Sequence, residues 1–286
     1  MSATEPGPAA QAAVIAHYHA EGHLPRHLLA LVRVLAARVG RIVFVSTGLS
    51  DAAAAELEPF AAVIRRENIG YDFWSYKTGI DALGDRSGLE RLLLLNSSFI
   101  CVDPERVCAA MLGPIAGPAL RGLSLSHDRD LHLQSYCLAF EDRTLIASQH
   151  FAEWWQAMTP VSDREQVIIR YELGLSRHFA DAGVPLQAAY EPDRNDLLVA
   201  LCRAIGNANF SSRTYLSAAH DSDRVQLDLQ PARSLNPTHY LWDRLYARFG
   251  ILKIELLRDN PTRQNLARFR LQLSPAVQSL ITDGLR

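Results

Sequence analysis

Lysine is almost absent from this sequence of 286 residues: 27 of its 29 basic residues are arginine, and the exceptions are Lys77 and Lys253. With 31 acidic residues the formal net charge is -2, so the chain offers no bulk attraction for nucleic acid or an anionic membrane. No hydrophobic run approaches the ~20 residues needed to span a bilayer. Residues 1–13 lack the basic start and hydrophobic centre of a signal peptide. We therefore expect a cytoplasmic protein.

Three familiar motifs are also missing. The four cysteines form no CxxC pair, which argues against a zinc knuckle or a thioredoxin-like site. No GxGxxG follows the first expected strand, and there is no Walker A loop. A nucleotide would therefore have to bind through side chains at strand ends.

Hydrophobic runs alternate with helical patterns in the first half of the chain. Short β-branched or apolar runs predict strands, and the segments between them show helical spacing or a capping serine. This alternation predicts an α/β fold with a mainly parallel, Rossmann-like sheet and helices on both faces. The strands are expected at residues 13–19, 41–46, 61–65, 92–95 and 121–126, with a helix at 72–83.

The second half is expected to be more helical. Ser162 and Glu165 have the spacing of a capping box and predict a helix to residue 181. We expect a disordered tail at residues 1–12, a ligand-binding half at 13–130, and a second half of the same domain at 131–286. Further elements are expected as helices at 196–205 and 237–248, a long loop at 207–235 and a strand at 251–256.

The segment 66–77 is the most unusual part of the chain. It combines four aromatic residues, an Asn-x-Gly turn and Lys77 between a strand and a helix. A helix N-terminus favours phosphate oxygens, and Lys77 would add a cation. The alternative is that the aromatic residues pack on the sheet and Lys77 is solvated. Ligands of parallel sheets bind at the carboxyl ends of the strands, which adds residues 17–19, 46–47 and 96–98.

Other polar groups have two readings each. His17 and His19, with His23 and His27, could hold a metal in a hydrolase or could be separate hydrogen-bonding residues. Asp128 and Asp130 follow a strand and could supply an acid or base, or could belong to a solvated turn. Glu172 borders the hydrophobic face of its helix, so it is either functional or paired within that helix.

Several pieces of the chain together resemble the rhamnan synthesis protein F family, which is associated with glycosyl transfer in the synthesis of rhamnose-rich polysaccharides. They occur in the family's order and cover roughly residues 13–262. The pieces are Asn68-Ile-Gly-Tyr-Asp-Phe-Trp-Ser-Tyr-Lys-Thr-Gly79, Leu92-Leu-Leu-Leu-Asn-Ser-Ser98, His132-Leu-Gln-Ser-Tyr136, Arg170-Tyr-Glu-Leu-Gly-Leu-Ser176, Asn236-Pro-Thr-His-Tyr-Leu-Trp242 and Glu255-Leu-Leu-Arg-Asp-Asn-Pro261.

The resemblance implies a GT-A-like fold with a nucleoside-diphosphate sugar donor, for which rhamnose is the candidate sugar, and a glycan or lipid-linked acceptor. It implies an inverting glycosyltransferase, with other polysaccharide-assembly proteins as partners and a peripheral position at the inner membrane as an open alternative. Asp128, Asp130 and Glu172 are the candidate catalytic bases. The expected substrate-binding residues are His17, Tyr18, Asn68, Gly70, Tyr71, Asp72, Lys77, Asn96, Ser97, Ser98, His132, Gln134 and His239.

The chain departs from the family where an acidic metal-binding motif is expected. Asn96-Ser97-Ser98 ends the fourth strand, and Ser124-Leu125-Ser126 ends the fifth without the carboxylate expected there. A cation that bridges a diphosphate needs hard oxygen ligands, usually carboxylates. No residue is therefore assigned to a metal, and the cofactor stays open, with Mg²⁺ or Mn²⁺ disfavoured. The other hypotheses are a catalytically silent sugar- or nucleotide-binding relative and the metal-dependent hydrolase.

Overall fold

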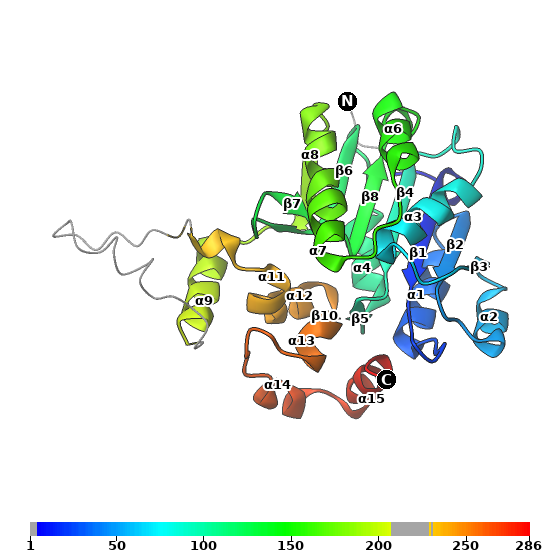
Figure 1. The fold of residues 1–286 in the computed structure, drawn as a ribbon. Coiled ribbons are helices and arrows are strands. Elements are labelled where there is room, and N and C mark those ends of the chain that lie inside the picture. Colours follow the sequence, from blue (N-terminus) through cyan, green and yellow to red (C-terminus); the bar gives the residue numbers. More distant parts are fainter. Residues whose placement is uncertain (1–4, 207–228, 230) are drawn as a thin grey trace.

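The computed structural model describes residues 5–206, 229 and 231–286. Eight strands of this described part form one mixed sheet (Figure 1). Six of the eight run parallel, and only β8 and β7 run against them. The strands lie in the order β3 (Ala62–Arg65), β2 (Arg41–Ser46), β1 (Gln11–His17), β4 (Arg91–Asn96), β8 (Cys137–Glu141), β6 (Ala119–Ser126) and β7 (His132–Leu133), with β9 (Leu186–Tyr190) also paired to β6.

Helices cover both faces of the sheet. Successive residues of each buried strand point to opposite faces, so each strand contributes to two hydrophobic cores. In β1, Ala13 and Ile15 join one hydrophobic core, while Val14 joins the other. The first core includes side chains from α1 (Arg26–Ala36), α2 (Asp51–Leu57), α4 (Pro104–Met111), α9 (Arg194–Ile205) and α12 (Trp242–Phe249). The second includes side chains from α3 (Tyr71–Ala82), α5 (Arg143–Ile146), α6 (Gln149–Ala157), α7 (Arg164–Val167) and α8 (Gly174–Asp181).

The predicted α/β class and the mainly parallel sheet are confirmed. The expected tail at residues 1–12 is too long, because Pro8–Ala10 forms a 3-10 turn and Gln11 already lies buried in β1. Strands β8 and β9 come from the second half of the chain and lie in the same sheet. The boundary at residue 130 therefore does not separate two sheets.

The helix predicted at residues 162–181 begins and continues differently. Asp163, not Ser162, is the N-cap, since its side chain accepts a hydrogen bond from the Gln166 N–H at 2.8 Å. The segment Ile168–Leu173, labelled η2, is a π-helix that separates α7 from α8. Such widened turns are frequent at functional sites.

A separate two-stranded sheet joins the C-terminal part to the segment that follows β4. The strand β5 (Phe99–Cys101) pairs antiparallel with β10 (Ile251–Lys253). The strand predicted at 251–256 is therefore too long, since α13 (Ile254–Arg258) follows at once, and the helix predicted at 237–248 is split into α11 (Pro237–Tyr240) and α12. Of the loop predicted at 207–235, residues 207–228 and 230 lie outside the described residues, and Pro231–Ser234 forms the 3-10 turn η4.

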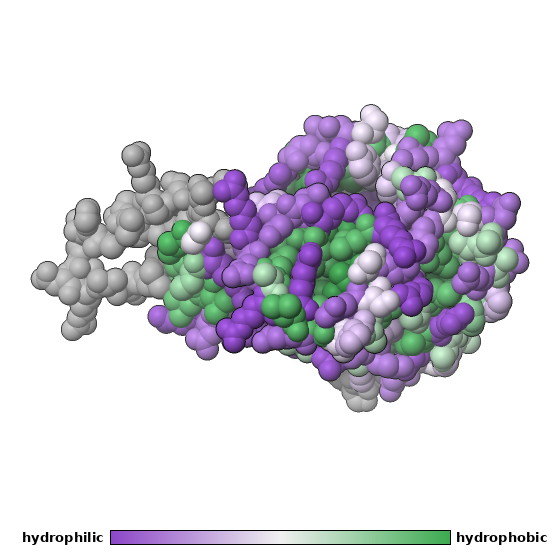
Figure 2. Space-filling view, turned by 90° about the horizontal axis from the view of Figure 1, so that it is seen from below, coloured by the Kyte–Doolittle hydropathy of each residue, from purple (hydrophilic) through white to green (hydrophobic). Residues whose placement is uncertain are grey.

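The last helices form a layer below the sheet. Trp242, Leu256 and Leu266 form a third hydrophobic cluster with partly buried Phe269 and Val277. They come from α12, α13 and the segments around α14 (Ala267–Gln272) and α15 (Pro275–Gly284). Seen from below, hydrophobic residues gather in the middle of this face between polar rims (Figure 2). None of the helices in the described residues is long and apolar enough to cross a membrane.

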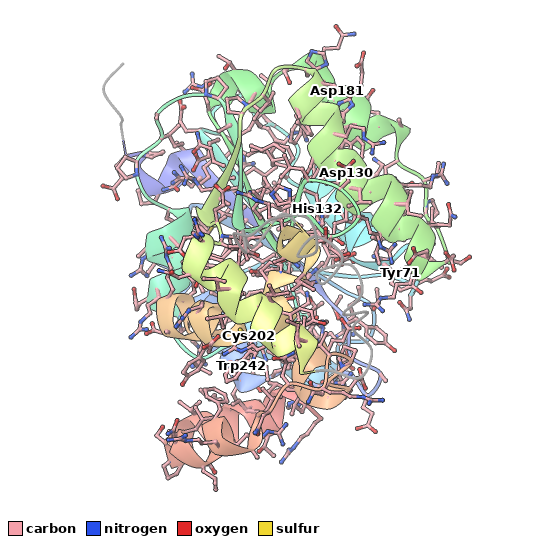
Figure 3. All side chains as sticks on the ribbon, turned by 90° about the vertical axis from the view of Figure 1, so that its left-hand side faces the viewer. Tyr71, Asp130, His132, Asp181, Cys202 and Trp242 are labelled. Carbon is pink, nitrogen blue, oxygen red and sulfur yellow. The ribbon has the colours of Figure 1, made fainter. Side chains whose placement is uncertain are left out.

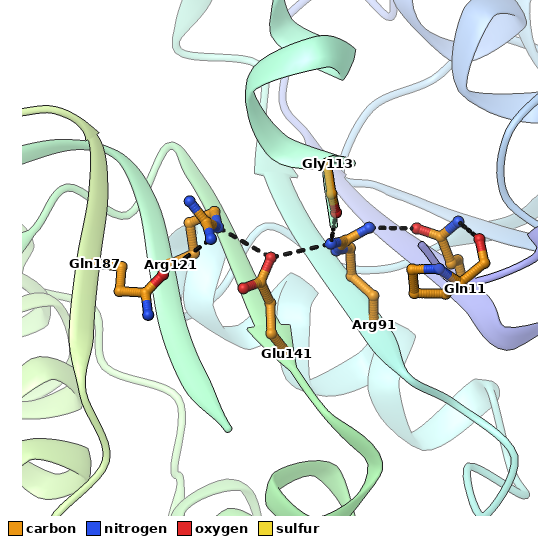
Figure 4. Close-up of polar contacts among 7 residues, drawn as sticks. Gln11, Arg91, Gly113, Arg121, Glu141 and Gln187 are labelled. Carbon is orange, nitrogen blue, oxygen red and sulfur yellow. Dashed lines mark hydrogen bonds and ion pairs between the residues drawn. The ribbon is translucent and has the colours of Figure 1, made fainter. Parts of the chain in front are cut away.

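A buried polar chain crosses the sheet at the end opposite to the carboxyl ends of the parallel strands (Figure 4). Glu141 accepts from Arg91 at 3.1 Å and from Arg121 at 2.9 Å. Arg91 also donates to Gln11 at 2.8 Å, and Arg121 donates to Gln187 at 2.9 Å. Buried charges need such paired and hydrogen-bonded partners. The network links β1, β4, β8, β6 and β9, and it leaves the carboxyl ends free for other roles.

Candidate functional site

The carboxyl end of β4 carries a group of interacting polar side chains. Asn96 is the last residue of β4, and its amide donates to Asp72 Oδ2 at 2.5 Å. The Asn96 Oδ1 atom accepts from the Ser98 N–H at 3.1 Å. The Lys253 Nζ atom donates to Ser98 Oγ at 2.7 Å. We call Asp72, Asn96, Ser98, Glu172 and Lys253 the strand-end cluster.

Glu172 enters the strand-end cluster from the π-helical segment. Its Oε1 atom accepts from both the backbone N–H and the hydroxyl of Ser135, each at 2.9 Å. Ser135 is itself held by its carbonyl, which accepts from the buried Tyr76 hydroxyl at 2.8 Å. These bonds fix one carboxylate oxygen of Glu172. Among the described residues no hydrogen bond reaches its Oε2 atom, which remains available to a ligand.

The charges of the cluster act on one another. Burial raises the pKa of Asp72, and the nearby Glu172 raises it further, while the Asn96 hydrogen bond and Lys253 act in the opposite direction. Burial lowers the pKa of Lys253, and Glu172, Asp72 and Glu255 oppose that shift. The cluster therefore combines carboxylates and one ammonium in a site with limited access to water.

The turn before α3 is shaped by Arg66. Its guanidinium donates to the carbonyls of Ile69 at 2.5 Å and Tyr71 at 2.6 Å, and to Ser75 Oγ at 2.7 Å. Burial lowers the pKa of Arg66, and Asp72 opposes that shift. Gly70 and Tyr71 both have positive φ, 68° and 53°, and a Cβ at Gly70 would lie 2.6 Å from the Trp74 Cβ. A bulky residue with positive φ is unusual and is often retained at a binding site.

Two exposed tyrosines flank this edge. Tyr18 follows β1 directly and its side chain is 57% exposed, and Tyr71 is 43% exposed at the start of α3. The Tyr18 N–H donates to Ser97 Oγ at 3.2 Å, which links the ends of β1 and β4. Asn68 is exposed in the same turn as Tyr71. The structure thus places Tyr18, Asn68, Gly70, Tyr71, Asp72, Asn96, Ser97 and Ser98 along the carboxyl edge of β1, β3 and β4.

Gln134, His239 and His132 lie outside the strand-end cluster and have other partners. Gln134 accepts from Ser124 at 2.8 Å and donates to Asn236 at 3.1 Å. His239 lies 3.7 Å from Glu255, and burial lowers the His239 pKa. The ring of His132 contacts the Asp130 carbonyl at 2.9 Å.

Lys77 does not join the strand-end cluster. Its ammonium is paired with Asp81 on the next turn of α3 at 2.7 Å. Phe73 and Tyr76 of the same helix are buried on the sheet. Phe73 and Tyr76 agree with the alternative in which the aromatic residues pack on the sheet, whereas the Lys77 side chain is ion-paired and 17% exposed rather than solvated.

The candidate bases are separated by the structure. Asp130 is exposed and pairs with Arg177 of α8 at 2.5 Å. In Figure 3, Asp130 lies beside His132, and Tyr71 lies apart from both. Asp128 is partly buried just after β6, where its N–H donates to Ser126. Of the three, Glu172 is the one whose charge acts on Asp72 and Lys253 together.

The four N-terminal histidines have separate partners. His17 bonds Ser46 at 2.9 Å, and the His27 ring accepts from the Cys101 N–H at 3.3 Å. His19 lies after β1, which ends at His17, so the strand expected at residues 13–19 extends two residues too far. His19 instead accepts the backbone N–H groups of Glu21 and His23, which close a turn. Within the described residues there is no group of three His, Cys, Asp or Glu residues placed to hold a metal.

Sequence reasoning did not assign Lys253 or Ser135 to the site. The scarcity of lysine singled out Lys77 and Lys253 equally, but only Lys77 followed an expected parallel strand. The pairing of β10 with β5 is what brings Lys253 beside Ser98, because Lys253 is the partner of Phe99. A long-range antiparallel pairing of three residues leaves no local signal in the sequence.

Comparison with known proteins confirms the family resemblance over part of the chain. Residues 122–203 match the family described as rhamnan synthesis protein F. The virulence protein VirA of Vibrio anguillarum is 30% identical over 209 residues, which are 70% of this chain and 63% of VirA. The protein y4gN of Sinorhizobium fredii is 27% identical over 191 residues, which are 64% of this chain and 49% of y4gN. The chain thus spans about half to less than two thirds of these relatives.

Among solved structures, similarity extends over most of the chain at low identity. The glycosyltransferase GlyE of Streptococcus pneumoniae matches 96% of this chain and 61% of its own, with 11% identity and a TM-score of 0.44. The glucosyl-3-phosphoglycerate synthase of Mycobacterium tuberculosis matches 68% of this chain and 77% of its own, with 14% identity and a TM-score of 0.37.

Proposed function

Because residues 122–203 match the rhamnan synthesis protein F family, we propose that this protein transfers a sugar from a nucleoside-diphosphate sugar to a glycan or lipid-linked acceptor. The matched segment contains Glu172, which belongs to the strand-end cluster, and Ser135, which donates a hydrogen bond to Glu172. The family match supports the sugar-transferring role. Rhamnose as the sugar is the finer part of the proposal and follows from the family name.

One observation carries the proposal. A carboxylate inside the matched segment, Glu172, is fixed through one oxygen, and its charge acts on Asp72 and Lys253 at the carboxyl end of a mainly parallel sheet. Ligands of open α/β sheets bind at this edge. The exposed rings of Tyr18 and Tyr71 flank the same edge and offer flat surfaces to a base or sugar.

The proposed chemistry is an inverting displacement with Glu172 as general base. The Glu172 Oε2 atom would take the proton of an acceptor hydroxyl while that oxygen forms a bond to the anomeric carbon. The bond between the anomeric carbon and the donor diphosphate breaks, and the electron pair leaves with the diphosphate. Asp72 and Asn96 would position the donor sugar. Asp128 is the second candidate base and Asp130 the third, because the exposed Asp130 is already paired with Arg177.

A thermal-shift panel of UDP-, dTDP- and GDP-sugars tests donor binding. A ligand that binds only the folded chain raises the melting temperature, and at 100 times its Kd it adds about 2.7 kcal/mol of stability. We expect at least one nucleoside-diphosphate sugar to raise the melting temperature of the wild-type protein. The matching free sugar is expected to leave the melting temperature unchanged.

Paired variants locate the binding site. Asn96→Ala removes the amide that bonds Asp72 and should reduce the shift. Asn195→Ala, on the exposed surface of α9, should keep the shift of the wild type. A panel in which no nucleoside-diphosphate sugar changes the melting temperature would refute the proposed function.

A further inference from the structure

Lys253 is the single ammonium group in the strand-end cluster. It is the last residue of β10, and its Nζ atom lies 2.7 Å from Ser98 Oγ and 4.9 Å from the centre of the Tyr136 ring. Both contacts hold the ammonium at the end of β4. A lysine ammonium has three N–H donors. Among the described residues its one hydrogen-bond acceptor is Ser98, so two donors remain for a ligand.

Charged groups from four neighbouring elements face Lys253. Asp72 lies on α3, Glu172 on the π-helical segment and Glu255 on α13, and all three carboxylates favour the charged ammonium. Arg164 of α7 opposes it. His239 of α11 also interacts with Lys253, and the lysine lowers the pKa of that histidine. Carboxyl groups on three elements thus favour the charged form of Lys253 at the edge where ligands of this sheet type bind.

The residues at this position do not fit a divalent cation. Mg²⁺ and Mn²⁺ take hard oxygen ligands, with carboxylates bearing most of the charge. The end of β4 itself offers Asn96, Ser97 and Ser98. Both oxygens of the neighbouring Asp72 already accept hydrogen bonds, from the Asn96 amide and from the Phe73 N–H. Ser98 Oγ already accepts from the ammonium, and Asn96 Oδ1 already accepts from the Ser98 N–H. An ammonium 2.7 Å from Ser98 Oγ would repel any cation bound to that oxygen.

We propose that the Lys253 ammonium takes the place of a divalent cation and binds the diphosphate of the donor. This inference rests on the proposed function and deepens it, because it makes donor binding independent of metal. The two remaining N–H donors of Lys253 would bond phosphate oxygens. The same charge would stabilise the diphosphate as it leaves with the electron pair of the broken bond.

Calorimetry with inorganic pyrophosphate tests the proposal without any sugar or base. We expect wild-type protein to bind pyrophosphate with similar affinity in EDTA and in Mg²⁺. Lys253→Met should lower the affinity by about 10- to 100-fold, which is the usual worth of one charge-assisted contact. Arg143→Met is the matched control, because it removes one cation from an exposed ion pair with Glu90. It should bind pyrophosphate as the wild type does.

The pH dependence of binding separates a charge role from a packing role. Binding needs the protonated ammonium, so it should fall as pH rises through the Lys253 pKa. Burial lowers that pKa, so the fall should begin below the pH expected for an exposed lysine. Lys253→Arg should keep its affinity at the same alkaline pH, since a guanidinium stays charged. This comparison remains valid even where Lys253→Met does not fold.

Three results would overturn the inference: no pyrophosphate binding by the wild type, binding that needs Mg²⁺, or full affinity in a folded Lys253→Met variant. Failure of the proposed function looks different. Pyrophosphate would then bind through Lys253 while every nucleoside-diphosphate sugar of the panel failed to bind any better than pyrophosphate.

Discussion

The two buried histidines His17 and His27 are neutral at neutral pH, because burial disfavours the charged form of the ring. Burial is the main cause that lowers the pKa of His17 and of His27, each to about 4. The backbone N–H of Cys101 donates to His27 Nδ1, so that nitrogen must keep its lone pair. Neither Nε2 atom has a hydrogen-bond partner among the described residues. These rings are better explained as buried core groups than as metal ligands.

This burial predicts that the protein loses stability in mild acid. The unfolded chain takes up a proton near pH 6.5, whereas folded His27 takes it up only near pH 4. Between these values protons favour the unfolded state, so the free energy of unfolding falls as pH drops from 6.5 to 4 and gains nothing further above 6.5. For one such histidine the full loss is on the order of 3 kcal/mol.

Urea unfolding at pH 7 and pH 4.5 measures the effect. His27→Asn should be less stable at pH 7 but should lose less stability on acidification than the wild type. The exposed His150→Asn variant should lose as much stability between pH 7 and pH 4.5 as the wild type. If His27→Asn also lost as much stability as the wild type, this account of the histidine would be contradicted.

At the scale of elements, the sequence predicted five of the six parallel strands in the described residues, missed the parallel strand β9, and predicted the later helices less well. Residues 92–95 are uniformly leucine, and the strand they form is buried on both faces, as that pattern requires. The antiparallel strand β8 was missed because Cys137–Glu141 is short and lacks the β-branched residues that marked residues 41–46. Its place in the middle of the sheet depends on pairing with β4 and β6, which no local pattern records.

The same limit applies to the candidate site. Asn96, Ser98 and Asp72 could be placed from the rule that strand ends bind ligands. The sequence could identify Glu172 as a candidate but could not predict the direction of its side chain, because that direction depends on the π-helical segment and on Ser135. Lys253 depends on β10, which pairs with a strand about 150 residues earlier in the chain. Contacts distant in sequence thus decide which charges meet.

The cap of α7 gives a test at the scale of one element. Asp163 accepts from the Gln166 N–H and satisfies a donor that the helix start leaves free. Asp163→Ala should therefore lower the free energy of unfolding by about 1 kcal/mol. Ser162→Ala should change it by roughly 0.5 kcal/mol or less, as for most surface substitutions. The reverse order in urea unfolding would restore Ser162 as the cap.

At the scale of the molecule, the two edges of the sheet have different tasks. The buried network around Arg91 and Glu141 ties five strands together at one edge. The strand-end cluster lies at the other edge, where β10 contributes Lys253 and the π-helical segment contributes Glu172. The first edge therefore has a structural role in linking the strands, and the second contains the groups that we assign to sugar transfer.

The central claim is that Glu172 acts as the general base of sugar transfer. It is tested most directly by the rate of sugar release from a bound nucleoside-diphosphate sugar, measured in wild type and in Glu172→Gln. Glutamine keeps an oxygen that can accept from Ser135 but cannot take a proton from an acceptor hydroxyl. We predict donor binding within the wild-type range and turnover roughly 10²–10⁴-fold lower. Glu165→Gln, an exposed glutamate of the preceding helix, should keep wild-type turnover. Equal turnover in wild type and Glu172→Gln would contradict the account, and binding without turnover in the wild type would identify a catalytically silent relative.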